Sequence, residues 1–520
     1  MRKSEKIQIV KNVGSSWFAL GVNILVGLFL SPLILHRLGD TAFGIWVLIF
    51  SITGYYGLFD LGIRSSVVRY VSKFTAIQDH ESLAMVMNSS MLGYLALAGL
   101  SMMLTLFIGA RIGTLFHIPP QFQSTARWLI IMAGSSVAVG FPLGIFGGVL
   151  EGLQRFYVLN WTNIATTLLR AALIVVFLGR GCGLLTVGFI TVFVPFLASL
   201  VRCFIALRIL PIPWGLHYVD RATLREIAGY SGSTFIMMVS ARLKFRTDEL
   251  VIGTFISATA ITYFNIGNRI VDYVVQMVTS LSQIFVPMSS QSEARGNMDA
   301  LRTVFIAGNR VCGFIVFPIC ATLIILGKSV IEVWVGRKYV ATSYPILVIM
   351  LLSSTLMLAQ SASPRLLMGI GKHRTWALVS LLEGGANLVL SILLVRPYGI
   401  IGDAFGTAIP LCLSFLVFMP RHLCRLLGIK VVTYLREAYV LPLTASLPLV
   451  MVLLLMRRWF VAHTYWQLAI HLLAGGTMYG LCLLWVYSSQ RALAIGDLSP
   501  SETSSALPVK SVTPAVEVSP

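Results

Sequence analysis

Long apolar segments recur along this chain from one end to the other, and they restrict its fold more than any other feature. An apolar run of about 20 residues is long enough to cross a membrane as one helix. About fourteen such runs can be distinguished by their length and spacing. Their approximate centres are residues 25, 52, 97, 138, 168, 195, 241, 277, 316, 352, 386, 410, 446 and 477. The pattern predicts an all-α polytopic membrane protein.

The amino-acid composition agrees with this prediction. Of 520 residues, 57% are hydrophobic and 11% are charged, whereas about 25% are charged in soluble domains. The net charge of +19 comes from basic residues scattered through short loops, which argues against a nucleic-acid-binding domain. The seven cysteines show no CxxC spacing, so we expect neither a metal site nor a disulfide framework.

Lys and Arg are unequally distributed between the two sides predicted for these helices. The first apolar run, Val13–Leu35, follows a basic start. It is too long for a signal-peptide core and lacks a small-residue cleavage site, so it should remain as the first helix. With the amino terminus inside, about 22 basic residues fall on the cytoplasmic side and about 10 on the other. We therefore expect both termini in the cytoplasm.

The chain also contains an internal repeat. The segment that begins at Gly148 reads GVLEGLQRFYVLNWTNIATTLLRAALIVVFLG, and the one that begins at Arg365 reads RLLMGIGKHRTWALVSLLEGGANLVLSILLVR. In both, a helix ends in a Gly-containing basic turn and an amphipathic helix follows. The repeat predicts two six-helix lobes and a final helix pair. The predicted units are an N-lobe at 1–210, a C-lobe at 211–430, a helix pair at 431–490 and a disordered cytoplasmic tail at 491–520.

Charged residues interrupt the seventh apolar run. They are Arg242, Lys244, Arg246, Asp248 and Glu249. Each charge at the centre of a membrane helix costs about 2.5 to 3.5 kcal/mol on insertion scales. Arg242, Arg246 and Glu249 share one helical face. Because the surplus charge is positive, the cluster predicts a watery cavity for an anionic cargo. The alternative for Asp248 and Glu249 is solvation near the outer membrane interface.

Polar residues form stripes on four further predicted helices. The stripes are Tyr56, Asp60 and Arg64 in helix two; Asn160, Asn163, Thr167 and Arg170 in helix five; Asn265, Arg269, Asp272, Gln276 and Gln283 in helix eight; and Ser380, Glu383, Asn387 and Ser391 in helix eleven. Spacings of three, four or seven keep each stripe on one face. Helices two and eight are equivalent in the repeat, as are five and eleven, so the stripes predict a chamber between the lobes.

The alternative interpretation of these stripes is structural. Polar residues in membrane helices also hold neighbouring helices together. In that case Asp60 with Arg64, and Arg269 with Asp272, would be self-satisfied pairs.

Two segments resemble a known family. The first is LGDTAFGIWVLIFSITGYYGLFDLGIRSSVVRYVSKF, and its matching positions are Leu38, Gly39, Gly44, Trp46, Asp60, Leu61, Gly62 and Arg69. The second, TDELVIGTFISATAITYFNIGNRIVDYV, begins at Thr247. Both are similar to bacterial Wzx-type polysaccharide flippases of the multidrug/oligosaccharidyl-lipid/polysaccharide (MOP) exporter superfamily. The resemblance implies a two-lobed fold like that of MATE transporters and alternating access. It also implies transfer of an undecaprenyl-pyrophosphate-linked oligosaccharide to the outer leaflet of the inner membrane.

The polar residues of the predicted chamber suit such a cargo. Arg binds phosphate through bidentate hydrogen bonds, and amide side chains bind sugar hydroxyls. The candidate cargo-binding residues are Arg242, Arg246, Arg269, Arg64, Arg170, Asn265, Gln276, Asn163 and Asn387. Burial in a low-dielectric cavity favours the protonated form of a carboxyl group. The candidate ion-coupling residues are therefore Asp60, Asp272, Glu383, Asp248 and Glu249.

Other functions remain open. Within the superfamily they are a lipid II (peptidoglycan precursor) flippase and a MATE-type multidrug or cation antiporter, although an exporter of cations would need a net acidic chamber. A membrane glycosyltransferase or ligase would need a long extracytoplasmic loop, and the sequence Gly327-Lys328-Ser329 lacks the first P-loop glycine. We expect a monomeric transporter without catalytic residues, cofactor or metal. Its expected partners are the lipid-linked oligosaccharide, the bilayer and a polysaccharide polymerase or chain-length protein, and not nucleic acid.

Overall fold

The computed structural model describes residues 3–225, 238–240, 242–244 and 246–496. Within these residues all regular structure is helical, and twelve segments are long and apolar enough to cross a membrane. One of them, Arg374–Leu427, is interrupted at Gly399, whose φ of 59° and ψ of −143° separate two helices. The predicted all-α polytopic fold is confirmed, with a helix count close to fourteen. The span expected near residue 241 and the tail after residue 496 fall wholly or partly outside the described residues.

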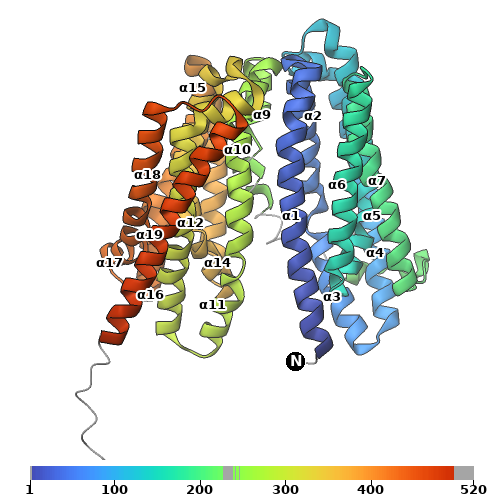
Figure 1. Ribbon diagram of the computed structural model, residues 1–520. Helices are drawn as coiled ribbons and strands as arrows, with labels where there is room; N and C mark the ends of the chain where they lie inside the picture. The colour runs from blue at the N-terminus through green and yellow to red at the C-terminus, as the bar shows by residue number, and fades with distance from the viewer. Residues whose placement is uncertain (1–2, 226–237, 241, 245, 497–520) are drawn as a thin grey trace, which may run out of the picture.

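The first half of the chain forms one helical bundle, drawn blue to teal in Figure 1. Its helices are α1 (Lys3–Leu38), α2 (Asp40–Tyr55), α3 (Ile63–Ile77), α4 (His80–Leu115), α5 (Pro120–Gly152), α6 (Phe156–Gly179) and α7 (Leu184–Ile209). Helix α5 packs against α4 and α7, and α1 packs against α6.

The second half forms another bundle, drawn green to red. It begins with α9 (Asp248–Phe255), α10 (Ala258–Ser282), α11 (Phe285–Ala294), α12 (Met298–Val335), α13 (Val340–Ala359) and α14 (Ala362–Gly369). It continues with α15 (Arg374–Leu413), α16 (Met419–Leu427), α17 (Val431–Leu435), α18 (Leu441–Trp459) and α19 (Tyr465–Gly496). Helix α18 packs against α12 and α19. The start of α1 and the end of α19 lie at the same end of the molecule (Figure 1).

The turn at the centre of the predicted repeat has the same geometry in both bundles. The N–H of Arg155 donates to the carbonyl of Leu150 (2.8 Å), and the N–H of Lys372 donates to the carbonyl of Leu367 (3.0 Å). The residue before each donor has a positive φ, 56° in the first turn and 68° in the second. Each pair of equivalent residues is 217 positions apart. The repeat therefore extends to the backbone hydrogen bonds of this turn.

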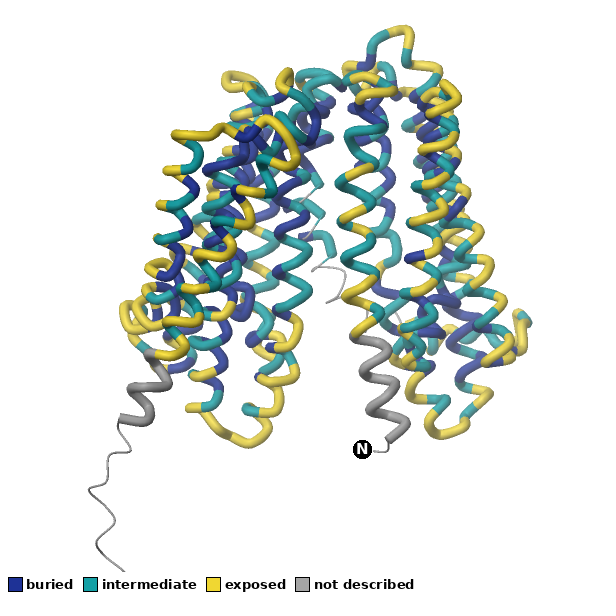
Figure 2. Tube along the Cα trace, in the orientation of Figure 1, coloured by how far each residue is buried: buried dark blue, intermediate teal, exposed yellow. Residues whose placement is uncertain are grey.

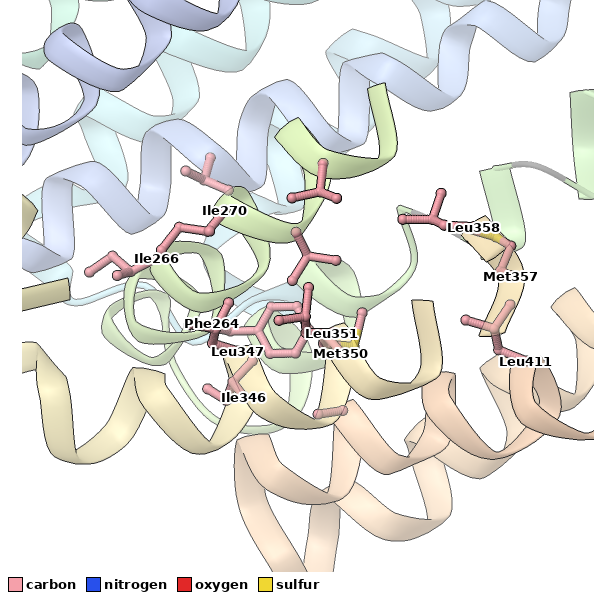
Figure 3. Packing of buried hydrophobic residues seen from close by; sticks show 14 of the residues in the cluster. Phe264, Ile266, Ile270, Ile346, Leu347, Met350, Leu351, Met357, Leu358 and Leu411 are labelled. Atoms are coloured by element: carbon pink, nitrogen blue, oxygen red, sulfur yellow. The ribbon is translucent and has the colours of Figure 1, made fainter. Parts of the chain in front are cut away.

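Apolar packing between helices fixes the second bundle. Phe264 of α10 and Leu347 of α13 are completely buried and lie together in Figure 3. Helices α10 and α13 approach closely at Gly267, where a Cβ would lie 2.6 Å from the carbonyl oxygen of Ser343. In contrast, large apolar side chains such as Phe107 and Leu382 are exposed, and exposed positions recur along the outside of both bundles in Figure 2. Such a surface suits the hydrocarbon core of a membrane.

The two bundles touch at the end of the molecule away from the chain termini. Thr262 of α10 donates a hydrogen bond to the backbone carbonyl of Asp40 at the start of α2 (2.6 Å). The Asp40 carboxylate forms an ion pair with Lys338 and accepts from Tyr339 (2.6 Å). Gly44 packs directly on the backbone carbonyl of Ala258, so any larger residue there would force the bundles apart. We call this contact the closed end.

Candidate functional site

A cavity of about 250 Å³ lies between the two bundles, next to the closed end. Its polar lining is Ser31 of α1, Ser51 of α2, Arg242, Arg246 and Glu249 from the segment leading into α9, and Asn265 and Arg269 of α10. Trp46 and Phe50 of α2 complete one wall. We call it the interlobe cavity. It brings together Arg242, Arg246 and Arg269, three of the five arginines predicted to bind the cargo.

Local structure explains how these arginines reach the cavity. Gly54 and Gly57 leave space at the end of α2, and the Arg242 guanidinium lies 3.1 Å from where a Cβ on Gly57 would be. Arg269 donates to the Tyr273 hydroxyl one helical turn further along α10 (3.2 Å), and its guanidinium lies 5.3 Å from the centre of that ring. Packing on an aromatic face suits the planar guanidinium.

The interlobe cavity carries excess positive charge. Within the described part of the chain, none of Arg242, Arg246 and Arg269 forms an ion pair. The predicted pairing of Arg269 with Asp272 is therefore wrong as a direct contact, because Arg269 bonds to Tyr273 instead. Asp272 still feels the attraction of Arg246 and Arg269. An anionic group entering the cavity would find three guanidinium groups available.

Three carboxylates gather beside this cavity, deep in the second bundle. Asp248 and Glu249 begin α9, and Asp403 lies in the second half of α15; each is at most 2% exposed. Asp248 accepts a hydrogen bond from Thr407 (2.8 Å). Both oxygens of Asp403 and one of Glu249 are buried without a hydrogen-bond partner. We call these three residues the carboxylate cluster.

The sequence analysis missed Asp403 and Thr407 of this arrangement. The run GDAFGTA, which begins at Gly402, places an acidic residue inside an apolar segment, and that was the available signal. Asp248 and Glu249 are buried rather than solvated at an interface, so the alternative proposed for them is wrong.

Lys244, Glu383 and Asn387 form a separate buried network. Lys244 and Glu383 form an ion pair of 2.5 Å, with side-chain exposures of 8% and 2%. Asn387 donates to the backbone carbonyl of Lys244 (3.0 Å), and Ser391 donates to Asn387 (3.2 Å). Asn387 is thus engaged inside the second bundle and does not line the interlobe cavity. Gln276 lies further along α10 and does not line the interlobe cavity either.

The stripe predicted for helix two does not exist as a single helical face. Helix α2 ends at Tyr55, a 3-10 segment covers Tyr56–Asp60, and Leu61 and Gly62 have φ of 48° and 81°. This break removes the helical register between Asp60 and Arg64. The two residues stay close, but their side chains do not pair with each other.

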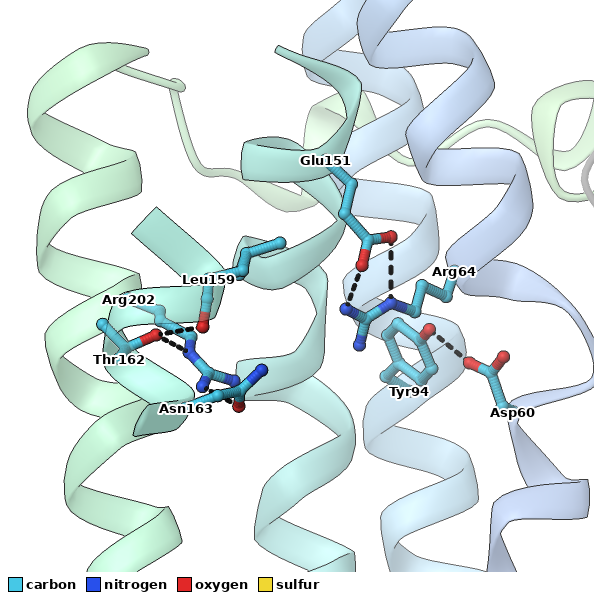
Figure 4. A network of polar contacts seen from close by, with 8 residues as sticks. All are labelled: Asp60, Arg64, Tyr94, Glu151, Leu159, Thr162, Asn163 and Arg202. Carbon is cyan, nitrogen blue, oxygen red and sulfur yellow. Dashed lines mark hydrogen bonds and ion pairs between the residues drawn. The ribbon is translucent and has the colours of Figure 1, made fainter. Parts of the chain in front are cut away.

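Asp60 and Arg64 instead bond to other helices. Arg64 forms a bidentate pair with Glu151 of α5 (2.7 and 3.3 Å), and Asp60 accepts from Tyr94 of α4 (2.5 Å), as Figure 4 shows. The predicted Asp60–Arg64 pair is therefore wrong. Asn163 and Arg170 of α6 line another cavity, together with Arg202, a residue that the sequence analysis did not single out.

Residues 148–344 match a protein family described as "Polysaccharide biosynthesis protein". The chain is 20% identical over 427 residues to a putative O-antigen transporter of Shigella flexneri, which covers 79% of this chain and 97% of that protein. Its fold resembles that of the lipid II flippase MurJ in an inward closed conformation, with a TM-score of 0.70, 17% identity, and coverage of 92% of this chain and 98% of that one.

A second solved structure has the same fold. It is an inward-facing MATE family multidrug transporter of the MOP superfamily, with a TM-score of 0.65, 15% identity, and coverage of 78% of this chain and 94% of that one. Family, relatives and fold agree with the resemblance found in the sequence, and they are those of transporters rather than enzymes. The chain is a multi-pass membrane protein that has the fold of these two transporters, and residues 148–344 match the polysaccharide-biosynthesis family.

Proposed function

We propose that this protein moves an undecaprenyl-pyrophosphate-linked oligosaccharide from the cytoplasmic to the outer leaflet of the bacterial inner membrane during surface-polysaccharide synthesis. The observation that carries the proposal is the group of three arginines in the interlobe cavity, Arg242, Arg246 and Arg269. A cargo with a multiply charged pyrophosphate suits a cavity with this surplus of guanidinium groups.

Neutral groups in the same cavity support a cargo that also carries sugars. Asn265 and the hydroxyls of Ser31 and Ser51 line it beside the arginines. Amide and hydroxyl groups donate and accept hydrogen bonds, as sugar hydroxyls require. Trp46 and Phe50 provide aromatic surface against the apolar faces of sugar rings. A cationic drug would be repelled by the arginines, which disfavours a cation antiporter.

Transport would proceed by alternating access. The closed end seals the interlobe cavity on the side away from the termini, through Asp40, Gly44 and their partners. Release of cargo on that side requires these contacts to separate while contacts form at the other end. The contacts around Asp40 are polar and lie beside apolar packing of α2 against α9 and α10, so opening requires both to separate.

Ion coupling would act through the carboxylate cluster. Arg246 is attracted electrostatically by Asp248, Glu249 and Asp272. A proton or monovalent cation bound among these carboxylates would weaken that attraction and leave Arg246 freer to hold the pyrophosphate. Among the carboxylates predicted for coupling, Glu383 is held by Lys244 and Asp60 by Tyr94. We therefore place Asp248, Glu249 and Asp272 ahead of Asp60 and Glu383.

Complementation of a strain that lacks the gene tests the proposal. The variant Arg242→Ala, Arg246→Ala should abolish surface polysaccharide at normal expression, and Arg269→Ala should reduce it strongly. The matched control is Arg111→Ala, which removes an exposed arginine of α4 outside the interlobe cavity and should leave polysaccharide output unchanged. Normal output from the double variant would refute the role of the arginines.

Transfer of lipid II is a second candidate function. The observation that favours it is the fold likeness to the lipid II flippase over 92% of this chain. The interlobe arginines suit that cargo as well, because it also carries a pyrophosphate. Depletion of the host's own lipid II flippase separates the two functions. Rescue of growth would support lipid II transfer, and restoration of surface polysaccharide without rescue would support the first proposal.

The orientation proposed for the chain is testable by cysteine labelling. Arg337 is next to Lys338, which pairs with Asp40 at the closed end. Lys372 lies in the turn between α14 and α15, and α14 lies toward the end of the molecule that holds the chain termini (Figure 1). With both termini in the cytoplasm, a cysteine at Arg337 should react with an impermeant reagent added outside, and a cysteine at Lys372 should not. The reverse labelling would invert the proposed orientation.

A further inference from the structure

A second polar cavity, of about 440 Å³, lies within the first bundle between α1, α6 and α7. Its polar lining is Asn23, Asn163, Thr166, Thr167, Arg170, Ser199 and Arg202. We call it the N-lobe cavity. It contains two arginines, whereas the described residues around it contribute no carboxylate to its lining.

The contacts of its arginines leave their charges uncompensated. Arg202 donates to the Thr162 hydroxyl (2.8 Å) and to the Asn163 side-chain oxygen (2.7 Å), both of which are neutral acceptors (Figure 4). Neither Arg170 nor Arg202 forms an ion pair with a described residue. Glu151, a carboxylate that attracts Arg202, is already held by Arg64. Two half-buried cations in one cavity are costly unless an anion joins them.

The N-lobe cavity and the interlobe cavity lie along the same face of α1. Asn23 lines the first and Ser31 lines the second, and Gly27 between them packs on the Tyr273 hydroxyl of α10. Residues four apart share one helical face, so the cavities are separated by eight residues, or about 12 Å along the axis. Arg170 also repels Arg269 across the two bundles. The two cavities are therefore neighbours along α1.

We propose that the N-lobe cavity binds the carboxylate of an acidic sugar in the same glycan whose pyrophosphate occupies the interlobe cavity. This inference rests on the proposed function. Arg170 and Arg202 supply the donors that a carboxylate accepts, in the planar geometry that arginine favours. Asn23, Asn163, Thr167 and Ser199 supply hydrogen bonds for the ring hydroxyls.

The identity of the anion follows from the composition of the proposed cargo. A cargo with one lipid-linked pyrophosphate has no second phosphate to fill this cavity, so a charged sugar is the anionic group left. A neutral sugar would leave both arginines unpaired, and a basic sugar would be repelled. The cavity thus selects for glycans with an acidic sugar close to the lipid-linked end.

Binding to the purified full-length protein in lipid nanodiscs tests this inference. The probes are farnesyl pyrophosphate, a disaccharide that contains glucuronate, its neutral counterpart that contains glucose, and inorganic pyrophosphate. Wild-type protein should bind the uronide at least about tenfold more tightly than the neutral disaccharide, as expected for a lost charge-assisted contact. Arg170→Gln and Arg202→Gln should each remove that preference, while affinity for farnesyl pyrophosphate should change by less than about threefold.

Variants in the other cavity provide the control. Arg242→Gln with Arg269→Gln should weaken farnesyl pyrophosphate binding and spare the uronide preference. Arg202→Lys, which keeps the charge, should retain part of that preference, and thermal unfolding of each variant confirms that it is folded. Equal binding of the two disaccharides by wild-type protein would overturn the inference. So would full displacement of the uronide by inorganic pyrophosphate, because the cavity would then be a general phosphate site.

The proposed function can fail separately. It fails if farnesyl pyrophosphate binding does not depend on Arg242 and Arg269, whatever the uronide does. If farnesyl pyrophosphate binding depends on them and the uronide preference is absent, only the acidic-sugar inference fails.

Discussion

Helix α6 of the first bundle and the first half of α15 in the second are equivalent in the repeat, yet their polar stripes have different environments. At an offset of 217 residues, Thr166 corresponds to Glu383 and Arg170 to Asn387. Thr166 and Arg170 line the N-lobe cavity. Glu383 and Asn387 are 4% and 1% exposed and bond to Lys244 and its backbone. The same repeated helix thus faces a cavity in one bundle and forms a buried core in the other.

Close packing within α15 accounts for part of the difference. Beyond the break at Gly399 the chain turns back, and Gly406 packs on Ser391 without intervening side-chain atoms. The second half of α15 therefore covers the stripe of the first half and brings Asp403 next to it. The comparison teaches that the repeat sets the helix arrangement, while small residues and charges decide which bundle offers groups to a cargo.

The largest expected effect breaks the buried pair of the second bundle. Glu383→Ala removes one partner of the buried Lys244–Glu383 ion pair, which should destabilise the protein by about 3 to 5 kcal/mol. The matched control at the equivalent position is Thr166→Ala. The Thr166 hydroxyl donates to the Thr162 carbonyl within α6 (2.6 Å), and its removal should change stability by less than about 0.5 kcal/mol. Thermal unfolding in detergent measures both. Equal shifts for the two variants would show that the equivalent stripes do not differ in environment.

An intermediate effect is expected one turn further along the same two helices. Asn387→Ala removes the hydrogen bond to the Lys244 carbonyl and should cost about 1 to 3 kcal/mol of stability. Arg170→Asn gives α6 the residue found at this position of α15, and it should leave stability nearly unchanged while reducing polysaccharide export. Unfolding temperature and export are measured for both variants. A large loss of stability for Arg170→Asn would make this arginine structural.

The smallest effect is expected near the start of the stripe. Asn160→Ala gives α6 the residue that α15 carries at Ala377. It removes hydrogen bonds of 2.9 Å to Ser15 and Ser16 of α1, close to the surface, and should cost no more than about 1 kcal/mol. Chemical unfolding of the reconstituted protein can resolve this change from the Asn387 variant. A cost as large as that of Asn387→Ala would show that the contact with α1 is a main support of the first bundle.

The sequence predicted the fold well because membrane-spanning helices can be identified by the length of their apolar runs. The repeat and the grouping of Arg242, Arg246 and Arg269 could also be predicted, since charges within apolar runs must face a polar interior. The positions of Asp60 and Arg64 could not be predicted from helical spacing. That spacing applies to an unbroken helix, and Leu61 and Gly62 interrupt the helix here. Arg202 and Asp403 gain their importance from contacts between helices, and helical spacing alone does not reveal those.

The most direct test of the central claim is transfer of an undecaprenyl-pyrophosphate-linked oligosaccharide across proteoliposomes that contain the purified protein. Wild-type protein and Arg111→Ala should expose the labelled lipid in the opposite leaflet at the same rate. Arg242→Ala with Arg246→Ala should reduce the rate to that of protein-free vesicles, because the interlobe cavity would lose two of its three guanidinium groups. Transfer by this double variant at the wild-type rate would contradict the account.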